Sequence, residues 1–390
     1  MTLRLTLSLV ALSLLTLSSC DASETSSDGT SSDDGNGDTP DSGERSYSGP
    51  GSYWTADFDE RNGTFQIEVA ESVGADPSMV VAGTYEDING WKVLTVVEAS
   101  DVEGAPAPGV QALGVEVPGF AFLLRPMDEA HNSVIPMLIA GECPEGNETL
   151  NWMIAQGFAS KDASDTAFDF FGTYRYDYDA NSAEVPTRYA LHEYALQAEA
   201  APPLYPGACD GSVIQIETAY TIEADLPPVN LWMVPGGAMV ETWYRHWETG
   251  VLEKQTLFGM PAAPIALDDV TDRTFIGMHF SAGTMEQPGD VMEITVTFDG
   301  DGVARAAILN DVTTGETAAA GAVLTVDEMN TPSAGFFTGG ISADGASLTG
   351  NLACAVAAGL GDDGQSMMTC VGQNPGDNRE AFTMMLVEQR

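Results

Sequence analysis

The sequence predicts an all-β protein made of several antiparallel β-sandwich or β-barrel-like domains that follow a disordered N-terminal tether. Three observations lead to this prediction. Apolar and polar residues alternate over many short segments, glycine and proline interrupt the chain at short intervals, and no long segment has the period of an amphipathic helix. A period of two with one polar face is typical of an antiparallel sheet that is solvated on one side.

The first 20 residues contain a short apolar stretch that ends at a cysteine. One basic residue, Arg4, precedes a leucine-rich segment over residues 5–17, and two serines then lead to Cys20. The segment is shorter than the roughly 20 apolar residues that a membrane-spanning helix needs, and it has the proportions of a secretory signal.

Residues 17–20 (LSSC) resemble the lipobox of a bacterial lipoprotein precursor. The resemblance implies a signal peptide over residues 1–19, cleavage before Cys20, diacylglycerol on the Cys20 sulfur and an acyl chain such as palmitate on its amine. Two or more acyl chains anchor a protein stably. We therefore expect a cell-envelope protein that is attached to the membrane through Cys20, with the outer membrane favoured and its face left open. The alternative is an ordinary cleaved signal peptide.

Residues 20–50 are expected to form a disordered acidic tether. After Cys20 they are mostly Ser, Asp, Gly and Thr, and almost nothing in them can be buried. A flexible chain of this length has a typical reach of about 30 Å. The folded part would therefore stand away from the membrane.

The strands predicted after the tether follow the alternation of apolar residues. Clear examples are residues 64–69, residues 214–222 and residues 291–298. Because a single core over 340 residues would be unusually large, we expect a β-rich region at 51–268, as one large or two smaller domains, and a separate β domain at 269–390.

One spacing suggests a different division of the chain. Asp59, Asp179 and Asp299 each follow an alternating segment that ends in an aromatic residue, and they are evenly spaced along the chain. Equal spacing suggests three related modules of domain size. However, a strand that ends in Asp before a turn is a common local pattern. Both divisions stay open at this point.

The chain is strongly acidic. It has 14 Lys and Arg residues against 58 Asp and Glu residues, a net charge of −44. This charge excludes nucleic acid as a partner and excludes binding to anionic lipids through basic patches. Two explanations remain: adaptation to saline surroundings, and binding of Ca²⁺, the one cofactor that the sequence suggests. The candidate calcium ligands lie two residues apart at strand ends: Asp57, Asp59, Asp177, Asp179, Asp299 and Asp301.

The remaining cysteines predict two disulfides. With Cys20 lipidated, an even number is left in an oxidising compartment. Cys354 and Cys370 flank a turn sequence, Gly-Asp-Asp-Gly, at 361–364, so the two can face each other across a hairpin. Cys143–Cys209 follows by elimination, and four buried free thiols are the alternative.

No catalytic residue is assigned from the sequence. It contains no G-x-S-x-G, Walker A or H-E-x-x-H motif, and its four histidines are isolated from one another. Carboxylates are so numerous that any two could be named as a glycosidase pair, and such a choice means little without geometry.

The best candidate binding surface is the aromatic segment at 241–247. Strand alternation places Trp243, Arg245 and Trp247 on one face, where indole rings and a guanidinium can stack on sugars or on a partner's side chains. The alternative is that these aromatic residues are simply part of the sheet core.

Two functional hypotheses follow from these observations. The favoured one is a lipid-anchored envelope protein without enzymatic activity, which binds a protein or glycan partner or serves as a structural module. The alternative is an exported hydrolase that acts on envelope or environmental polysaccharide, and it requires two carboxylates at catalytic separation in a cleft.

Overall fold

The structure of the chain is a computed structural model that describes most of residues 43–390. The described residues are 43–49, 54–70, 76–125, 134–139, 141, 143, 149–157, 169–177, 182–192, 195–198, 203–210, 213–223, 225–234, 237–245, 252–261, 266–281, 291–330, 336–343, 349–373 and 381–390. Residues 43–390 form one compact unit.

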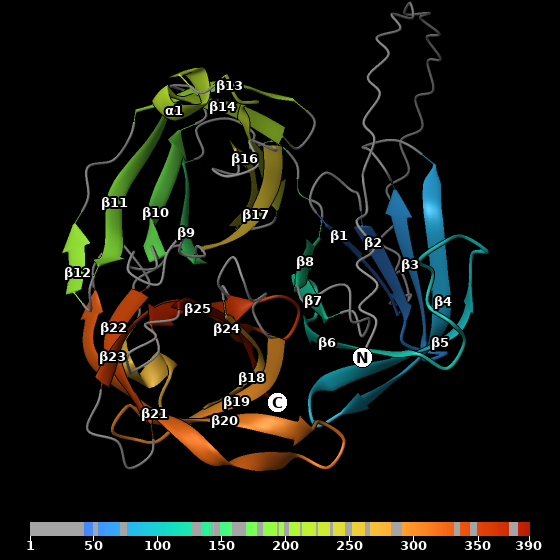
Figure 1. Cartoon of the computed structure of the whole chain (residues 1–390). Helices are drawn as coiled ribbons and strands as arrows, with labels where there is room; N and C mark the ends of the chain where they lie inside the picture. Colours follow the sequence, from blue (N-terminus) through green and yellow to red (C-terminus); the bar gives the residue numbers. More distant parts are fainter. Residues whose placement is uncertain are drawn as a thin grey trace, which may run out of the picture. The chain divides into compact units, whose positions relative to one another are not determined.

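The first sheet is a closed antiparallel barrel of eight strands, called here the N-terminal barrel. Consecutive strands pair, and β8 returns to β1 through the pair Ser48 and Leu138. Its strands, blue to cyan in Figure 1, are β1 (Glu44–Ser48), β2 (Trp54–Asp59), β3 (Thr64–Ala70), β4 (Pro77–Ile88), β5 (Trp91–Ala99), β6 (Gln111–Val117), β7 (Ala121–Arg125) and β8 (Ile135–Leu138).

The second sheet, called here the middle sheet, has nine strands. The first and last of these strands in chain order, β9 and β17, pair with each other in the centre of the sheet. The two edges of the sheet are β12 and β13. The strands, green to yellow in Figure 1, are β9 (Thr149–Gly157), β10 (Asp169–Asp177), β11 (Ser182–His192), β12 (Ala195–Ala198), β13 (Leu204–Asp210), β14 (Val213–Thr218), β15 (Val229–Val234), β16 (Gly237–Arg245) and β17 (Leu252–Pro261).

The third sheet, called here the C-terminal barrel, is again closed and has eight strands. They are β18 (Thr274–Ser281), β19 (Val291–Phe298), β20 (Val303–Asp311), β21 (Glu316–Asn330), β22 (Phe336–Ala343), β23 (Thr349–Leu360), β24 (Gln365–Gln373) and β25 (Ala381–Glu388). The described helices are the five-residue α1 (Ala219–Glu223) and a 3-10 helix (Leu267–Asp269). No helix among the described residues combines the length and hydropathy needed to cross a membrane.

The all-β prediction is confirmed, and closed barrels are the architecture of two of the three sheets. The C-terminal barrel lies inside the predicted range 269–390, whereas the range 51–268 holds all of the middle sheet and most of the N-terminal barrel. The strands before Asp59, Asp179 and Asp299 are β2, β10 and β19, each the second strand of its own sheet. The hypothesis of three related modules stays a prediction.

Two predicted boundaries need correction. β1 lies inside the expected tether of residues 20–50, because Tyr47 on this strand is completely buried. The strand predicted over residues 214–222 ends at Thr218, and α1 begins at the next residue, Ala219. The backbone N–H of Thr221 donates to the Thr218 hydroxyl at 3.1 Å and caps the helix.

Both predicted disulfides are present. Cys354 and Cys370 are direct cross-strand partners on β23 and β24, and the turn at 361–364 joins these strands. Cys143, which precedes the middle sheet, is bonded to Cys209 on β13.

Both barrels are filled by side chains. In the N-terminal barrel the ring of Phe58 meets Phe122 at 4.8 Å and Tyr85 at 5.4 Å between ring centroids, both edge to face. In the C-terminal barrel Phe275 meets Phe298 at 6.0 Å, and the disulfide of Cys354 and Cys370 is buried in the same cluster. Eight strands enclose little more than the side chains that fill them.

The outer faces of the two barrels bury one another along one side. Successive residues are therefore buried on both faces of β7, β24 and β25, as over 121–124 and 382–387. One apolar cluster combines residues of the N-terminal barrel, of the C-terminal barrel and one methionine of the middle sheet. Its members include Trp91, Val93, Val115, Leu123, Leu138, Met260, Ile276, Met278, Met367, Met385 and Val387.

Hairpin turns flank this apolar interface. The backbone N–H of Asp362 donates to the carbonyl oxygen of Pro118 at 2.8 Å, so the β23–β24 turn rests on the β6–β7 turn. At another point the side-chain N–H of Asn89 donates to the backbone carbonyl of Val312 at 3.1 Å. The backbone carbonyl of Asn89 accepts the side-chain amide of Gln389 at 2.7 Å. These polar contacts help to fix the position of one barrel against the other.

A buried ionic cluster lies at the end of the N-terminal barrel beside the β6–β7 turn. The Glu116 carboxylate is 3.0 Å from the Lys92 ammonium and accepts the Tyr47 hydroxyl at 2.6 Å. Burial lowers the pKa of Lys92, but Glu116 and Asp87 raise it more, and the net shift is upward. Lys92 therefore stays charged. Arg45 extends the cluster, 3.6 Å from Glu116 and 3.7 Å from Asp362 of the C-terminal barrel.

The turn contact between the barrels can be tested with two glycines. An added Cβ at Gly361 would lie 2.0 Å from the Pro118 carbonyl oxygen, whereas one at Gly359 would meet nothing within 4 Å. Both residues have positive φ, so Gly359→Ala is expected to lower the free energy of unfolding by about 1–2 kcal/mol. Gly361→Ala should cost roughly 1–3 kcal/mol more because of the clash. Urea unfolding measures both, and equal losses would contradict the turn contact.

The ionic cluster makes a second prediction. Glu116→Leu leaves Lys92 buried without its main counter-charge and should cost about 3–5 kcal/mol of unfolding free energy. Adding Lys92→Met removes the stranded charge, so the double variant should be more stable than Glu116→Leu alone. A double variant whose loss equals the sum of the two single losses would show that the two groups are not coupled.

Candidate functional site

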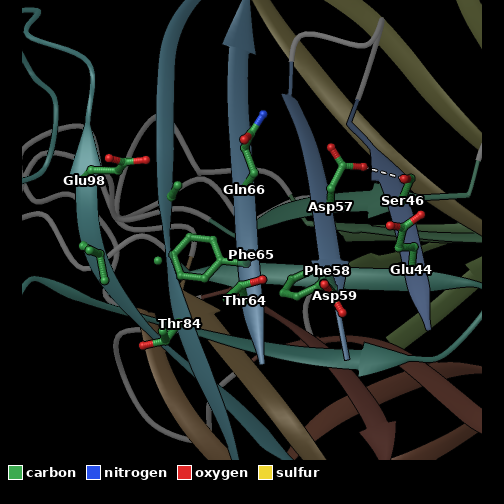
Figure 2. Close-up of a pocket in the computed structure, with 13 residues that line it drawn as sticks. Glu44, Ser46, Asp57, Phe58, Asp59, Thr64, Phe65, Gln66, Thr84 and Glu98 are labelled. Carbon is green, nitrogen blue, oxygen red and sulfur yellow. Dashed lines mark hydrogen bonds between the residues drawn. The ribbon is translucent and has the colours of Figure 1, made fainter. Parts of the chain in front are cut away.

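A groove of about 530 Å³ lies on the outer face of the N-terminal barrel over β1 to β5. Figure 2 shows the side chains that line it, with Phe58 and Phe65 between the polar residues. The outer face of these strands is polar, and the inward face supplies the aromatic core. The lining residues are Glu44, Ser46, Asp57, Phe58, Asp59, Thr64, Phe65, Gln66, Ala82, Gly83, Thr84, Val97 and Glu98.

Strand register arranges the lining in two rows across the sheet. The first row runs through Ser46, Asp57, Gln66, Ala82 and Glu98, each the direct partner of the next. Direct antiparallel partners have Cβ atoms about 4.5–5.5 Å apart. Each row is therefore a continuous line of neighbouring side chains.

The second row lies two residues along the strands. It runs through Glu44, Asp59, Thr64 and Thr84, again as direct partners. Together the rows present carboxylates, hydroxyls and one carboxamide to the groove.

A β-bulge shapes one side of the groove. Ala82 lies opposite Glu98 and Gly83 lies opposite Val96, so Val97 is the extra residue on β5. Its side chain is 57% exposed. An added Cβ at Gly83 would lie 2.0 Å from the Thr95 carbonyl oxygen and 2.8 Å from the Phe65 ring, and only glycine fits there.

The groove is anionic. Four carboxylates line it, and Lys, Arg and His are absent from the lining residues. Ser46 donates its hydroxyl to Asp57. Asp59 accepts the side-chain amide of Asn62 at 2.6 Å, and this bond is the main reason that the pKa of Asp59 is lowered. Because ionised carboxylates only accept hydrogen bonds, a ligand here must supply ammonium, guanidinium or hydroxyl donors.

The candidate calcium ligands fall in different places. Asp57 and Asp59 line the groove, while Asp299 accepts the backbone N–H groups of Asp301 at 2.9 Å and Val303 at 3.0 Å and thereby closes the β19–β20 turn. Asp177 ends β10, and Asp179 lies outside the described residues. The described residues hold no group of three His, Cys, Asp or Glu side chains that could bind a metal ion. The calcium site stays a prediction.

The predicted aromatic surface is placed only by its backbone. Trp243 and Arg245 lie on β16, where their partners on β17 are Lys254 and Leu252. The side chains of Trp243 and Arg245 are outside the described part, as are Trp247 and Cys20 altogether.

Sequence reasoning selected Asp57 and Asp59 but missed the rest of the groove. Ser46, Gln66 and Glu98 are far apart along the chain, and each is an ordinary polar residue on the wet face of a strand. A signal existed in the alternation of residues 64–69, which assigned Gln66 to the polar face. Only the register of five strands reveals which polar residues become neighbours.

Comparison of the chain with protein-family models, with curated proteins and with solved structures finds no match to any of them.

Proposed function

We propose that this chain is a lipid-anchored envelope protein that binds a basic segment of a partner protein in the anionic groove of its N-terminal barrel. The observation that carries the proposal is the pair of polar rows across β1 to β5, which places four carboxylates around one groove. A groove whose lining holds four carboxylates and no Lys, Arg or His complements a segment rich in Lys or Arg.

The remaining features of the chain fit a binding module. The closed barrels are filled by their own side chains, so an outer face is the natural place for a ligand. Strands position side chains more precisely than loops, and the groove is built entirely on strands. The lipobox-like sequence at Cys20 and the Ser- and Asp-rich tether would hold this groove at the membrane surface.

The proposal can be tested on residues 21–390 with a lysine decapeptide as the probe. Asp57→Asn with Glu98→Gln removes two charges from the first row of the groove. We expect this variant to bind the peptide about tenfold more weakly than the parent protein in titration calorimetry, because the loss of each of the two charge pairs costs about 0.7 kcal/mol.

A matched variant separates the groove from the general acidity of the chain. Asp268→Asn with Glu316→Gln removes the same charge from exposed positions outside the groove. It should bind like the parent protein, and equal weakening in both variants would contradict the proposed site. If peptidoglycan fragments or oligosaccharides bind instead and are cleaved, the hydrolase hypothesis gains and the present proposal fails.

A further inference from the structure

A histidine inside the C-terminal barrel lies between two methionines. His279 on β18 is the direct partner of Met292 on β19 and of Met384 on β25. Direct partners in an antiparallel sheet point to the same face, with Cβ atoms about 4.5–5.5 Å apart. An imidazole and two thioethers therefore form one short row.

The row lies on the inner face of the barrel. The imidazole of His279 stacks on Phe382 with 4.9 Å between ring centroids, and Phe382 and Met384 belong to the barrel core. The neighbouring residue Met278 faces the opposite way, into the apolar interface between the barrels. His279 and Met292 are only partly buried, so the row reaches from the core toward solvent.

The His279 ring carries an unused nitrogen. Its Nδ1 atom is inaccessible to solvent, and no other described residue offers it a hydrogen bond. Such an atom is unfavourable in a folded protein and needs an explanation. The ordinary pKa of a histidine is about 6.5, so an imidazole is mostly neutral at neutral pH. A neutral imidazole is the form that coordinates metals.

The donor set identifies the class of ligand. Thioether sulfur selects soft monovalent ions, and imidazole also suits copper, whereas calcium and magnesium need oxygen ligands. We propose that His279, Met292 and Met384 form a site for a soft monovalent metal ion, Cu(I) or Ag(I). Binding consists of lone-pair donation from Nδ1 and the two Sδ atoms, with no bond broken and no electron transferred. The site is independent of the groove on the N-terminal barrel.

The test uses Ag(I), which does not change its oxidation state, on disulfide-bonded residues 21–390 with carbon-13 labelled methionine methyl groups. We expect the methyl signals of Met292 and Met384 to shift on addition of one equivalent of Ag(I). Met278 on β18 and Met385 on β25 are the sequence neighbours of His279 and Met384 but face the barrel interface, and their signals should stay in place.

Variants give the matched affinity measurement. Met292→Leu with Met384→Leu preserves volume, as does Met278→Leu with Met385→Leu. The first pair should weaken Ag(I) binding by more than the roughly 10–100-fold that loss of a group supporting a metal ligand costs, and the second pair should not. His279→Phe keeps a ring against Phe382 and should lose the site as well.

Two results would overturn the proposal. One is methyl signals of Met292 and Met384 that do not move in the parent protein, a measurement that needs no variant. The other is unchanged Ag(I) affinity in the Met292 and Met384 double variant, which would place any bound silver elsewhere.

Discussion

Burial of one barrel's outer face against the other is the constraint on which the rest of the structure depends. A strand in an isolated barrel has one dry face and one wet face. Here the outer faces of β5 to β8 and of β23 to β25 are largely buried in the interface between the barrels. This interface contains large apolar residues such as Trp91 and Met385. Polar side chains gather on the parts of the strands outside the interface. The anionic groove lies on β1 to β4 and on the C-terminal end of β5, where Val97 and Glu98 are exposed.

The same constraint explains what the sequence could and could not predict. Alternation at 64–69 and 291–298 identified strands correctly because their outer faces are largely polar. Continuous apolar runs such as 382–387 carry no period of two, since both faces are buried. The hairpin disulfide was predictable because its turn lies between the cysteines. β1 was missed because only Tyr47 in this short polar segment reaches the core.

Sites that depend on register were beyond sequence reasoning. Asp57 and Glu98 belong to one row only because four successive strand pairings bring them to it, and a shift of one residue in any pairing would turn a strand's polar side chains inward. His279 was expected to be one of four isolated histidines. Its neighbours Met292 and Met384 come from the next strand in the sequence and from the last strand of the barrel.

The contacts between the barrels have a consequence for biogenesis. Asn89 is bonded to Gln389, which lies 300 residues later in the chain. The β6–β7 turn contacts the β23–β24 turn, which is synthesised near the C-terminus. During synthesis from the N-terminus, the apolar side of β5 to β8 therefore emerges long before the strands that cover it. Contacts between residues so far apart in sequence slow folding and leave apolar, aggregation-prone surface exposed in the meantime. A chaperone that shields the apolar side of the N-terminal barrel until the C-terminal strands are synthesised would therefore aid folding.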